Sequence, residues 1–306
     1  METVQDRMEA GDILVIDGGM GTELERRGVP MDAQSWAGSA LKNHPDMIRT
    51  IHRDFIDAGA DILIANTYAA APHVLCHAGI SESEALTLNR LACDLVREAV
   101  AEAAPDRRIW IAGSLSSFFA GLSTDGWPSK DEAARSYALQ AETLAAAGCD
   151  LLITEMMLDT TVSPLAVRAA TATGLPVWVG FSVRTANGRI VGLNGRDDIA
   201  FERIRDDCLG AGDVHAAGIM HSEMSDTPPG LDLLKEAWSG PLFAYPHSGS
   251  FRMPNWQFDD EIEPDAFARE AATYLDRGVI AIGGCCGMSQ HHIAALAQRL
   301  GRGLGS

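Results

Sequence analysis

The chain alternates between short apolar runs and longer segments of helical periodicity, and this alternation constrains its fold more than any other feature. Two doubly wound domains would also alternate, but they would show a linker or a change of rhythm, and the sequence has neither. Strict β–α alternation requires parallel strands joined by crossover helices. We therefore predict one α/β domain over residues 1–306, a closed (β/α)8 TIM barrel. Apolar runs predict strands at 12–16, 61–65, 108–112, 150–154, 176–183, 214–220, 241–245 and 279–282. Helical patterns follow them, beginning near 45, 81, 131, 160, 198, 231, 265 and 290.

Composition argues against several classes of partner and location. The formal net charge of −18 disfavours nucleic acid or an anionic membrane surface as a partner. No apolar run reaches the roughly 18 residues of a membrane span, and the charged first residues lack the apolar core of a signal peptide, so we expect a cytoplasmic protein. The 6 cysteines do not resemble a disulfide framework, and the adjacent pair among them is better explained by metal binding or catalysis.

The predicted barrel brings distant polar residues together. Active sites in this fold lie at the C-terminal ends of the strands. The polar residues that end the apolar runs are therefore candidates for one shared pocket: Asp17, Asn66, Thr67, Ser114, Glu155, Ser182, His221, His247, Cys285 and Cys286.

The last predicted strand ends in Gly283-Gly284-Cys285-Cys286-Gly287. Neighbouring side chains on a regular strand point to opposite faces, but flanking glycines allow both thiols to face one point. Together with His221 they would give one nitrogen and two sulfur ligands, a set that Zn²⁺ accepts while a fourth position stays free for substrate. The alternatives are a pair of small buried residues for the cysteines and a hydrogen-bonded strand end for His221. Asp17 and Glu155 have alternatives too, as helix caps or barrel ion pairs.

These motifs resemble the homocysteine S-methyltransferase family, which includes the enzymes that use betaine and S-methylmethionine. The similarity extends along nearly the whole chain, and its most specific element is the Gly-Gly-Cys-Cys-Gly segment. The other similar segments are Asp17-Gly18-Gly19-Met20-Gly21-Thr22-Glu23-Leu24, Ser35-Trp36, the run from His52 to Asp61, Asn66-Thr67-Tyr68 and the run from Asp150 to Glu155.

The resemblance implies a zinc-dependent methyl transfer from a small sulfonium or quaternary ammonium donor to the thiol of homocysteine, giving methionine. The family holds zinc through three cysteines, and His221 stands where the first of them would be. The substitution keeps zinc binding plausible but makes the site less electron-rich. The resemblance further implies that Asp17 and Glu155 hold the amino group of the acceptor. The other substrate-binding candidates are Gly18, Asn66, Trp36, Tyr68, Ser114 and His247.

The expected chemistry needs no general base from the protein. A free thiol with a pKa of about 8.5 is mostly protonated at neutral pH, whereas coordination to zinc deprotonates it. We therefore expect no catalytic residue beyond the zinc-activated thiol. An onium donor would favour aromatic faces, which Trp36, Tyr68, Phe118 and Phe119 could provide, although core packing is an equal alternative for the two phenylalanines.

Three segments at the predicted pocket mouth depart from the family pattern: Ser116-Ser117-Phe118-Phe119, Met156 after Glu155, and Tyr245-Pro246-His247-Ser248-Gly249. They leave the methyl donor and the acceptor open. One alternative is a zinc barrel enzyme with another thiol acceptor or a hydrolytic reaction. Another is a homologue that binds a thiol or metal without turnover. A homo-oligomer is compatible with the sequence.

Overall fold

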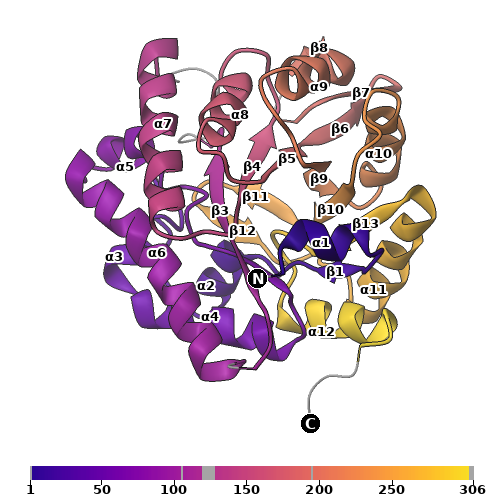
Figure 1. Ribbon diagram of the computed structural model, residues 1–306, viewed down its shortest axis with the longest axis horizontal. Helices are drawn as coiled ribbons and strands as arrows, with labels where there is room; N and C mark the ends of the chain where they lie inside the picture. Colours follow the sequence, from indigo (N-terminus) through magenta and orange to yellow (C-terminus); the bar gives the residue numbers. More distant parts are fainter. Residues whose placement is uncertain (1, 105, 119–127, 194–195, 303–306) are drawn as a thin grey trace.

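The computed structural model describes residues 2–104, 106–118, 128–193 and 196–302, which form a parallel barrel with helices packed around it (Figure 1). The strand order is β1-β13-β10-β9-β5-β4-β3-β2, and a parallel bridge between Ile16 and Ile62 closes the ring. The predicted (β/α)8 barrel is therefore confirmed. Its strands are β1 (Leu14–Val15), β2 (Ile62–Ile64), β3 (Trp110–Ser116), β4 (Leu151–Met157), β5 (Val177–Phe181), β9 (Ala216–Glu223), β10 (Leu242–His247) and β13 (Val279–Ile282).

Several helices begin where the sequence offers a capping side chain or a first-turn proline. The hydroxyl of Ser81 accepts the amide of Glu84 at 3.3 Å, as its position before the long helix predicts. Pro45 and Pro264 each start a helix, where a missing amide hydrogen costs nothing. The helices are α1 (Val4–Glu9), α2 (Met20–Arg26), α3 (Ala40–Asn43), α4 (Pro45–Asp57), α5 (Pro72–His77), α6 (Glu82–Ala103), α7 (Lys130–Ala146), α8 (Ser163–Thr171), α9 (Phe201–Leu209), α10 (Thr227–Lys235), α11 (Pro264–Ala272), a 3-10 helix (Thr273–Arg277) and α12 (Gln290–Arg299).

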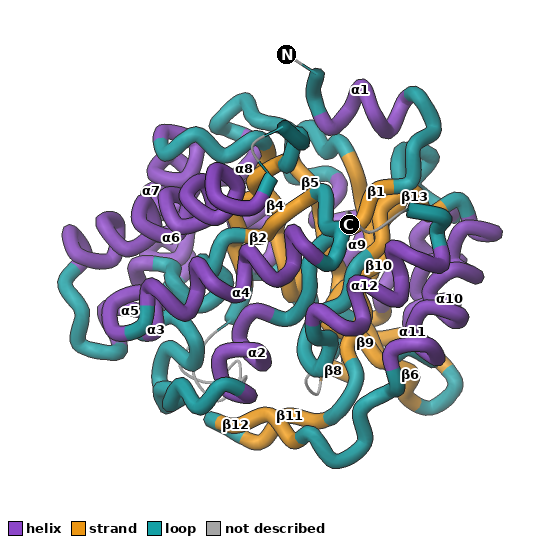
Figure 2. The backbone as a smooth tube through the Cα atoms, turned by 90° about the horizontal axis from the view of Figure 1, so that it is seen from below, coloured by secondary structure: helices purple, strands orange, loops and turns teal. Residues whose placement is uncertain are grey.

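The structure also contains two small antiparallel sheets that are separate from the barrel sheet and that we did not predict from the sequence. One contains β6 (Val183–Ala186), β7 (Arg189–Gly192) and β8 (Arg196–Ala200), and its first hairpin turns at Asn187-Gly188 with positive φ at both residues. The other pairs β11 (Ser250–Arg252) with β12 (Asn255–Gln257), where we expected only a loop. Figure 2 shows this second hairpin at one end of the barrel and α1 at the opposite end.

Several barrel strands continue past their predicted ends. Ser114, Glu155 and His221 therefore lie within β3, β4 and β9 rather than just beyond them. The backbone is irregular there, because pairing of β4 with β5 shifts register between Thr154 and Met157. Such irregularities re-aim side chains near active sites.

The barrel interior below these residues is a packed core. Trp178 and Phe243 are fully buried inside it, with ring centroids 5.3 Å apart. A filled interior confines any ligand site to the mouth of the barrel, as is general for this fold. Among the helices that the structure describes, none is both long enough and apolar enough to cross a membrane.

Candidate active site

The segment that follows β13 passes between the loops that follow β1 and β10. The amide of Cys285 donates to the carbonyl of Pro246 at 2.7 Å, and the amide of Ser248 donates to the carbonyl of Cys286 at 3.0 Å. Gly287 has a φ of 82°, and a Cβ at this position would meet the carbonyl oxygen of Ser248. This turn brings the two sulfur atoms within 3.7 Å of each other. The adjacent thiols thus face one region, as their glycine-flanked sequence predicts.

His221 connects the two thiols to a buried carboxylate. Its Nδ1 atom lies 2.9 Å from Cys285 Sγ, and its Nε2 atom lies 2.8 Å from Glu155 Oε2. The other carboxylate oxygen of Glu155 accepts the hydroxyl of Ser114. The imidazole also packs against Tyr68, with ring centroids 5.2 Å apart. A continuous chain of polar groups therefore runs from β3 to the cysteine segment.

Burial and mutual contact shift the ionisation of this cluster. Burial alone would lower the pKa of His221, but its interactions with Cys286 and Glu155 outweigh burial and raise that pKa to about 9. The hydrogen bond from Cys285 lowers the pKa of Cys286 to about 6, while burial raises the pKa of Cys285 well above its usual value. The cluster therefore favours one thiolate beside an imidazolium.

The donor atoms fit a zinc ion chemically. Two sulfurs that share a tetrahedral zinc at about 2.3 Å lie about 3.8 Å apart, close to the 3.7 Å between Cys285 and Cys286. The contact of His221 with Cys285 is instead a hydrogen bond, shorter than the roughly 3.6 Å between a nitrogen and a sulfur on one zinc. In this conformation, no group of three or more His, Cys, Asp or Glu side chains among the described residues is spaced to hold a metal ion. Metal binding would require His221 Nδ1 and Cys285 Sγ to separate by about 0.7 Å.

A small cavity of about 50 Å³ lies on one side of the cluster. Asp17 lies behind its wall, where its carboxylate accepts the amide of Ile64 at 2.9 Å and the hydroxyl of Tyr245 at 3.1 Å. Burial raises the pKa of Asp17 well above its usual value. The lining residues are Gly18, Gly19, Met20, Gly21, Trp36, Ala37, Ile64, Ala65, Asn66, Tyr68, Ala69, Glu155, His221, Tyr245, Cys285 and Cys286.

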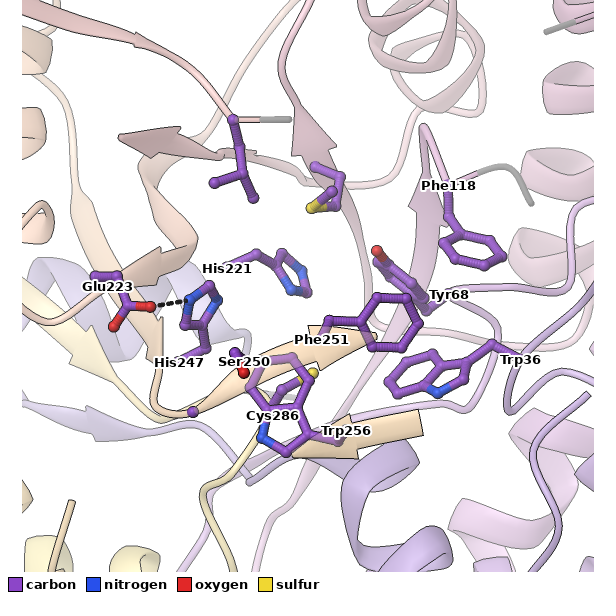
Figure 3. Close-up of a pocket in the computed structure, with 13 residues that line it drawn as sticks. Trp36, Tyr68, Phe118, His221, Glu223, His247, Ser250, Phe251, Trp256 and Cys286 are labelled. Carbon is purple, nitrogen blue, oxygen red and sulfur yellow. Dashed lines mark hydrogen bonds and ion pairs between the residues drawn. The ribbon is translucent and has the colours of Figure 1, made fainter. Parts of the chain in front are cut away.

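A larger cavity of about 270 Å³ lies on the other side (Figure 3). Aromatic rings surround it: Trp36 packs edge-on against Tyr68 and Phe251, with centroids 6.0 and 5.9 Å away. Glu223 and His247 pair at 3.1 Å on its rim. None of the described lining residues is a lysine or arginine. They are Trp36, Tyr68, Phe118, Met156, Leu193, His221, Glu223, His247, Gly249, Ser250, Phe251, Trp256 and Cys286.

The two cavities share Trp36, Tyr68, His221 and Cys286 as lining residues. The thiol and imidazole cluster is therefore accessible from both cavities. A small ligand in one cavity and a larger apolar or cationic ligand in the other would meet at Cys286 and His221.

The predicted site residues gather here with two qualifications. Most of them line one of the two cavities, and four do not. Asp17 and Ser114 lie behind the wall and hydrogen-bond to Tyr245 and Glu155. The hydroxyl of Thr67 donates to the carbonyl of Ser114, and the hydroxyl of Ser182 donates to the sulfur of Met156. Phe118 lines the larger cavity, and Phe119 lies outside the described residues. The contact between Glu155 and His221 was not predicted.

Sequence reasoning also missed several lining residues. Tyr245 was expected within a segment at the pocket mouth but not as a site residue, although its place at the end of the seventh apolar run could have identified it. Phe251 and Trp256 come from the hairpin that we expected to be a loop, and no local pattern indicated that they face the site.

Comparisons with known proteins show similarity in sequence and in fold along most of the chain. The family model described as homocysteine S-methyltransferase matches residues 14–300. Homocysteine S-methyltransferase YbgG of Bacillus subtilis (strain 168) is 28% identical, with 97% of each chain covered. Homocysteine S-methyltransferase of Escherichia coli (strain K12) is 30% identical, covering 95% of this chain and 96% of the relative. The crystal structure of the metallated form of the Escherichia coli homocysteine methyltransferase MmuM superposes with a TM-score of 0.78 at 27% identity, covering 95% of this chain and 98% of that one.

Proposed function

The chain belongs to the homocysteine S-methyltransferase family, and on that premise we propose that it moves a methyl group from a small sulfonium or quaternary ammonium donor to the thiol of homocysteine, giving methionine. One observation carries this proposal. A pair of thiols and an imidazole lie between a small cavity that Glu155 and Asn66 help to line and a larger aromatic one. A methyl transferase needs two substrates to meet at one sulfur atom, and this arrangement provides a compartment for each.

The smaller cavity suits the acceptor. Glu155 lines it and Asp17 lies just behind its wall, so two carboxyl groups lie near the place where the ammonium group of an amino acid would bind. Charge-assisted hydrogen bonds of this kind are stronger than neutral ones. Binding an ammonium group would also favour ionised Asp17, whose pKa is raised by burial. Gly18 and Asn66 lie on the same wall.

The larger cavity suits an onium donor. The rings of Trp36, Tyr68 and Phe251 present faces and edges to it, and a cation over an aromatic face gains about 1–2 kcal/mol when it is desolvated. Glu223 adds a negative charge at the rim, while the described lining residues supply no lysine or arginine. The local charge therefore favours a cationic donor.

Cys285, Cys286 and His221 are the residues that would hold zinc, and the metallated form of the Escherichia coli relative supports a metal in this fold. Bound zinc would supply the positive charge that keeps the acceptor thiol ionised at neutral pH. The chain itself orients the acceptor by its carboxylates and the donor by its aromatic rings. Such positioning removes much of the entropic barrier to reaction.

The transfer itself is a displacement at carbon. The acceptor sulfur supplies an electron pair to the methyl carbon as the bond from that carbon to the donor sulfur or nitrogen breaks. The leaving group keeps the bonding pair and departs as a neutral thioether or tertiary amine. The proton of the acceptor thiol has already left to solvent, so no protein side chain must accept it during the transfer.

The proposal is tested with zinc-loaded protein, homocysteine and a panel of sulfonium and betaine donors, with methionine measured by mass spectrometry. Methionine formed from at least one donor, at a rate proportional to enzyme concentration, is the expected result. A parallel panel of other thiols tests for a different acceptor, and donor loss without any methylated thiol would indicate hydrolysis. Either of these outcomes, without methionine, overturns the assignment of homocysteine.

A further inference from the structure

Position 221 of this chain is a histidine, and its side chain hydrogen-bonds to Glu155. The Glu155 side chain is buried, and both carboxylate oxygens are already engaged by His221 and Ser114. We propose that Glu155 is a positioning residue for metal binding, which fixes the tautomer and orientation of His221 so that Nδ1 faces the two cysteine sulfurs. The inference rests on the proposed function in one respect, that zinc is the metal of this site.

The hydrogen-bond pattern determines which imidazole nitrogen can bind a metal. An ionised carboxylate only accepts hydrogen bonds, so His221 Nε2, at 2.8 Å from Glu155, must carry the hydrogen. A metal ion binds only the neutral imidazole, so His221 must lose one of its two ring hydrogens when metal binds. The hydrogen that Glu155 accepts stays on Nε2, which leaves the lone pair on Nδ1. Nδ1 is the atom that lies 2.9 Å from Cys285 Sγ. The nitrogen aimed at the sulfurs is therefore the one able to act as a ligand.

The backbone is shaped to bring these two side chains together. Glu155 lies on β4 and His221 on β9, two strands that β5 separates in the sheet. His221 has a φ of 47° and Met156, next to Glu155, a φ of 57°. Residues with side chains adopt this left-handed region at a cost, and such positions concentrate at functional sites. The Tyr68 ring packed on the imidazole further restricts its orientation.

This role exists only because position 221 is histidine. The resemblance places a cysteine at this position in the family, and a thiolate ligand has no tautomer to fix. A carboxylate that hydrogen-bonds a metal-binding histidine typically contributes a factor of about 10–100 in metal affinity. The contribution of Glu155 to zinc affinity should therefore depend on His221, whereas a general electrostatic contribution of a buried carboxylate would not.

A double-mutant cycle measures this dependence. Zinc affinity is determined by competition with a chromophoric chelator for the wild type, Glu155→Ala, His221→Cys and the double variant. Glu155→Ala should weaken zinc binding about 10–100-fold in the wild type but only slightly in the His221→Cys background. Glu155→Gln should weaken zinc binding less, because its amide oxygen can still accept the Nε2 hydrogen while its amide nitrogen donates to Ser114.

Asp17→Asn serves as the matched control. It replaces another buried carboxyl group near the same cavity, one that hydrogen-bonds to Ile64 and Tyr245 rather than to His221, and it should leave zinc affinity unchanged. The optical spectrum of the Co²⁺-substituted protein adds a second readout, since it should change with Glu155→Ala and stay as in the wild type with Asp17→Asn. Thermal unfolding of each metal-free variant checks that it is folded.

Equal losses in both backgrounds, no loss in either, or a wild type that binds no zinc would each overturn the positioning role. None of these measurements involves methyl transfer. A protein that shows the expected cycle but forms no methionine would reject the proposed reaction and leave the role of Glu155 intact.

Discussion

Replacing either cysteine of the pair by alanine tests the metal site directly. Cys285 and Cys286 place their sulfurs 3.7 Å apart, nearly the separation imposed by one tetrahedral zinc. A zinc site with four ligands has a binding free energy of about 10–16 kcal/mol, or about 2.5–4 kcal/mol for each ligand. Because about 1.4 kcal/mol corresponds to a factor of ten, each substitution should weaken zinc binding about 60–700-fold.

The assay is chelator competition on metal-free protein, with thermal unfolding and circular dichroism to confirm the fold. Cys208→Ala is the matched control, because Cys208 is a fully buried free thiol on α9 that contributes to neither cavity. It should alter stability through packing alone and leave zinc affinity as in the wild type. If Cys285→Ala and Cys286→Ala keep wild-type zinc affinity, the cysteine pair does not hold the metal and the reasoning fails.

Three further predictions concern other parts of the chain. His221→Cys should retain stoichiometric zinc, because a thiolate replaces the imidazole; loss of metal, measured by elemental analysis, would remove position 221 from the coordination shell. Phe251→Leu should raise the donor KM about fivefold and leave the homocysteine KM unchanged, since it removes one aromatic ring worth about 1 kcal/mol to a cation; equal effects on both KM values would contradict the donor assignment. His52 is fully buried without a hydrogen-bond partner among the described residues, and burial lowers its pKa to about 3. The folded protein therefore keeps His52 neutral while the unfolded chain protonates it below pH 6.5, so stability is full above that pH and falls as the pH drops towards 3. Between pH 7.5 and pH 5 the wild type should lose about 2 kcal/mol more of its unfolding free energy than His52→Leu; equal losses in chemical denaturation would show that His52 does not titrate in this way.

The barrel was predictable because the alternation of apolar runs and helical patterns extends along the whole chain. Each apolar run ends near a polar residue, and a parallel barrel brings those ends together whatever the exact strand limits are. The cysteine pair was predictable for a local reason, because its glycines permit a turn that regular strand geometry would forbid. The structure places most of the strand-end candidates in the walls of the two cavities.

The contacts within the site were less predictable because they depend on sub-ångström geometry between distant strands. Glu155 and His221 are 66 residues apart in the sequence. Their contact depends on a register shift between β4 and β5 and on positive φ angles at Met156 and His221, and no local sequence pattern predicts these features. The aromatic hairpin was missed because β11 and β12 are three residues each, too short for a strand pattern to emerge. Its aromatic rings face the site through tertiary packing alone.

The most direct test of the central claim follows the methyl group itself. Zinc-loaded protein is incubated with homocysteine and a donor whose transferable methyl group carries three deuterium atoms. The account predicts methionine that is heavier by the three deuterium atoms, loss of this product when a chelator removes zinc, and its return when zinc is added back. If homocysteine yields no labelled methionine, or if the labelled product forms equally well without zinc, the proposed zinc-dependent transfer is wrong.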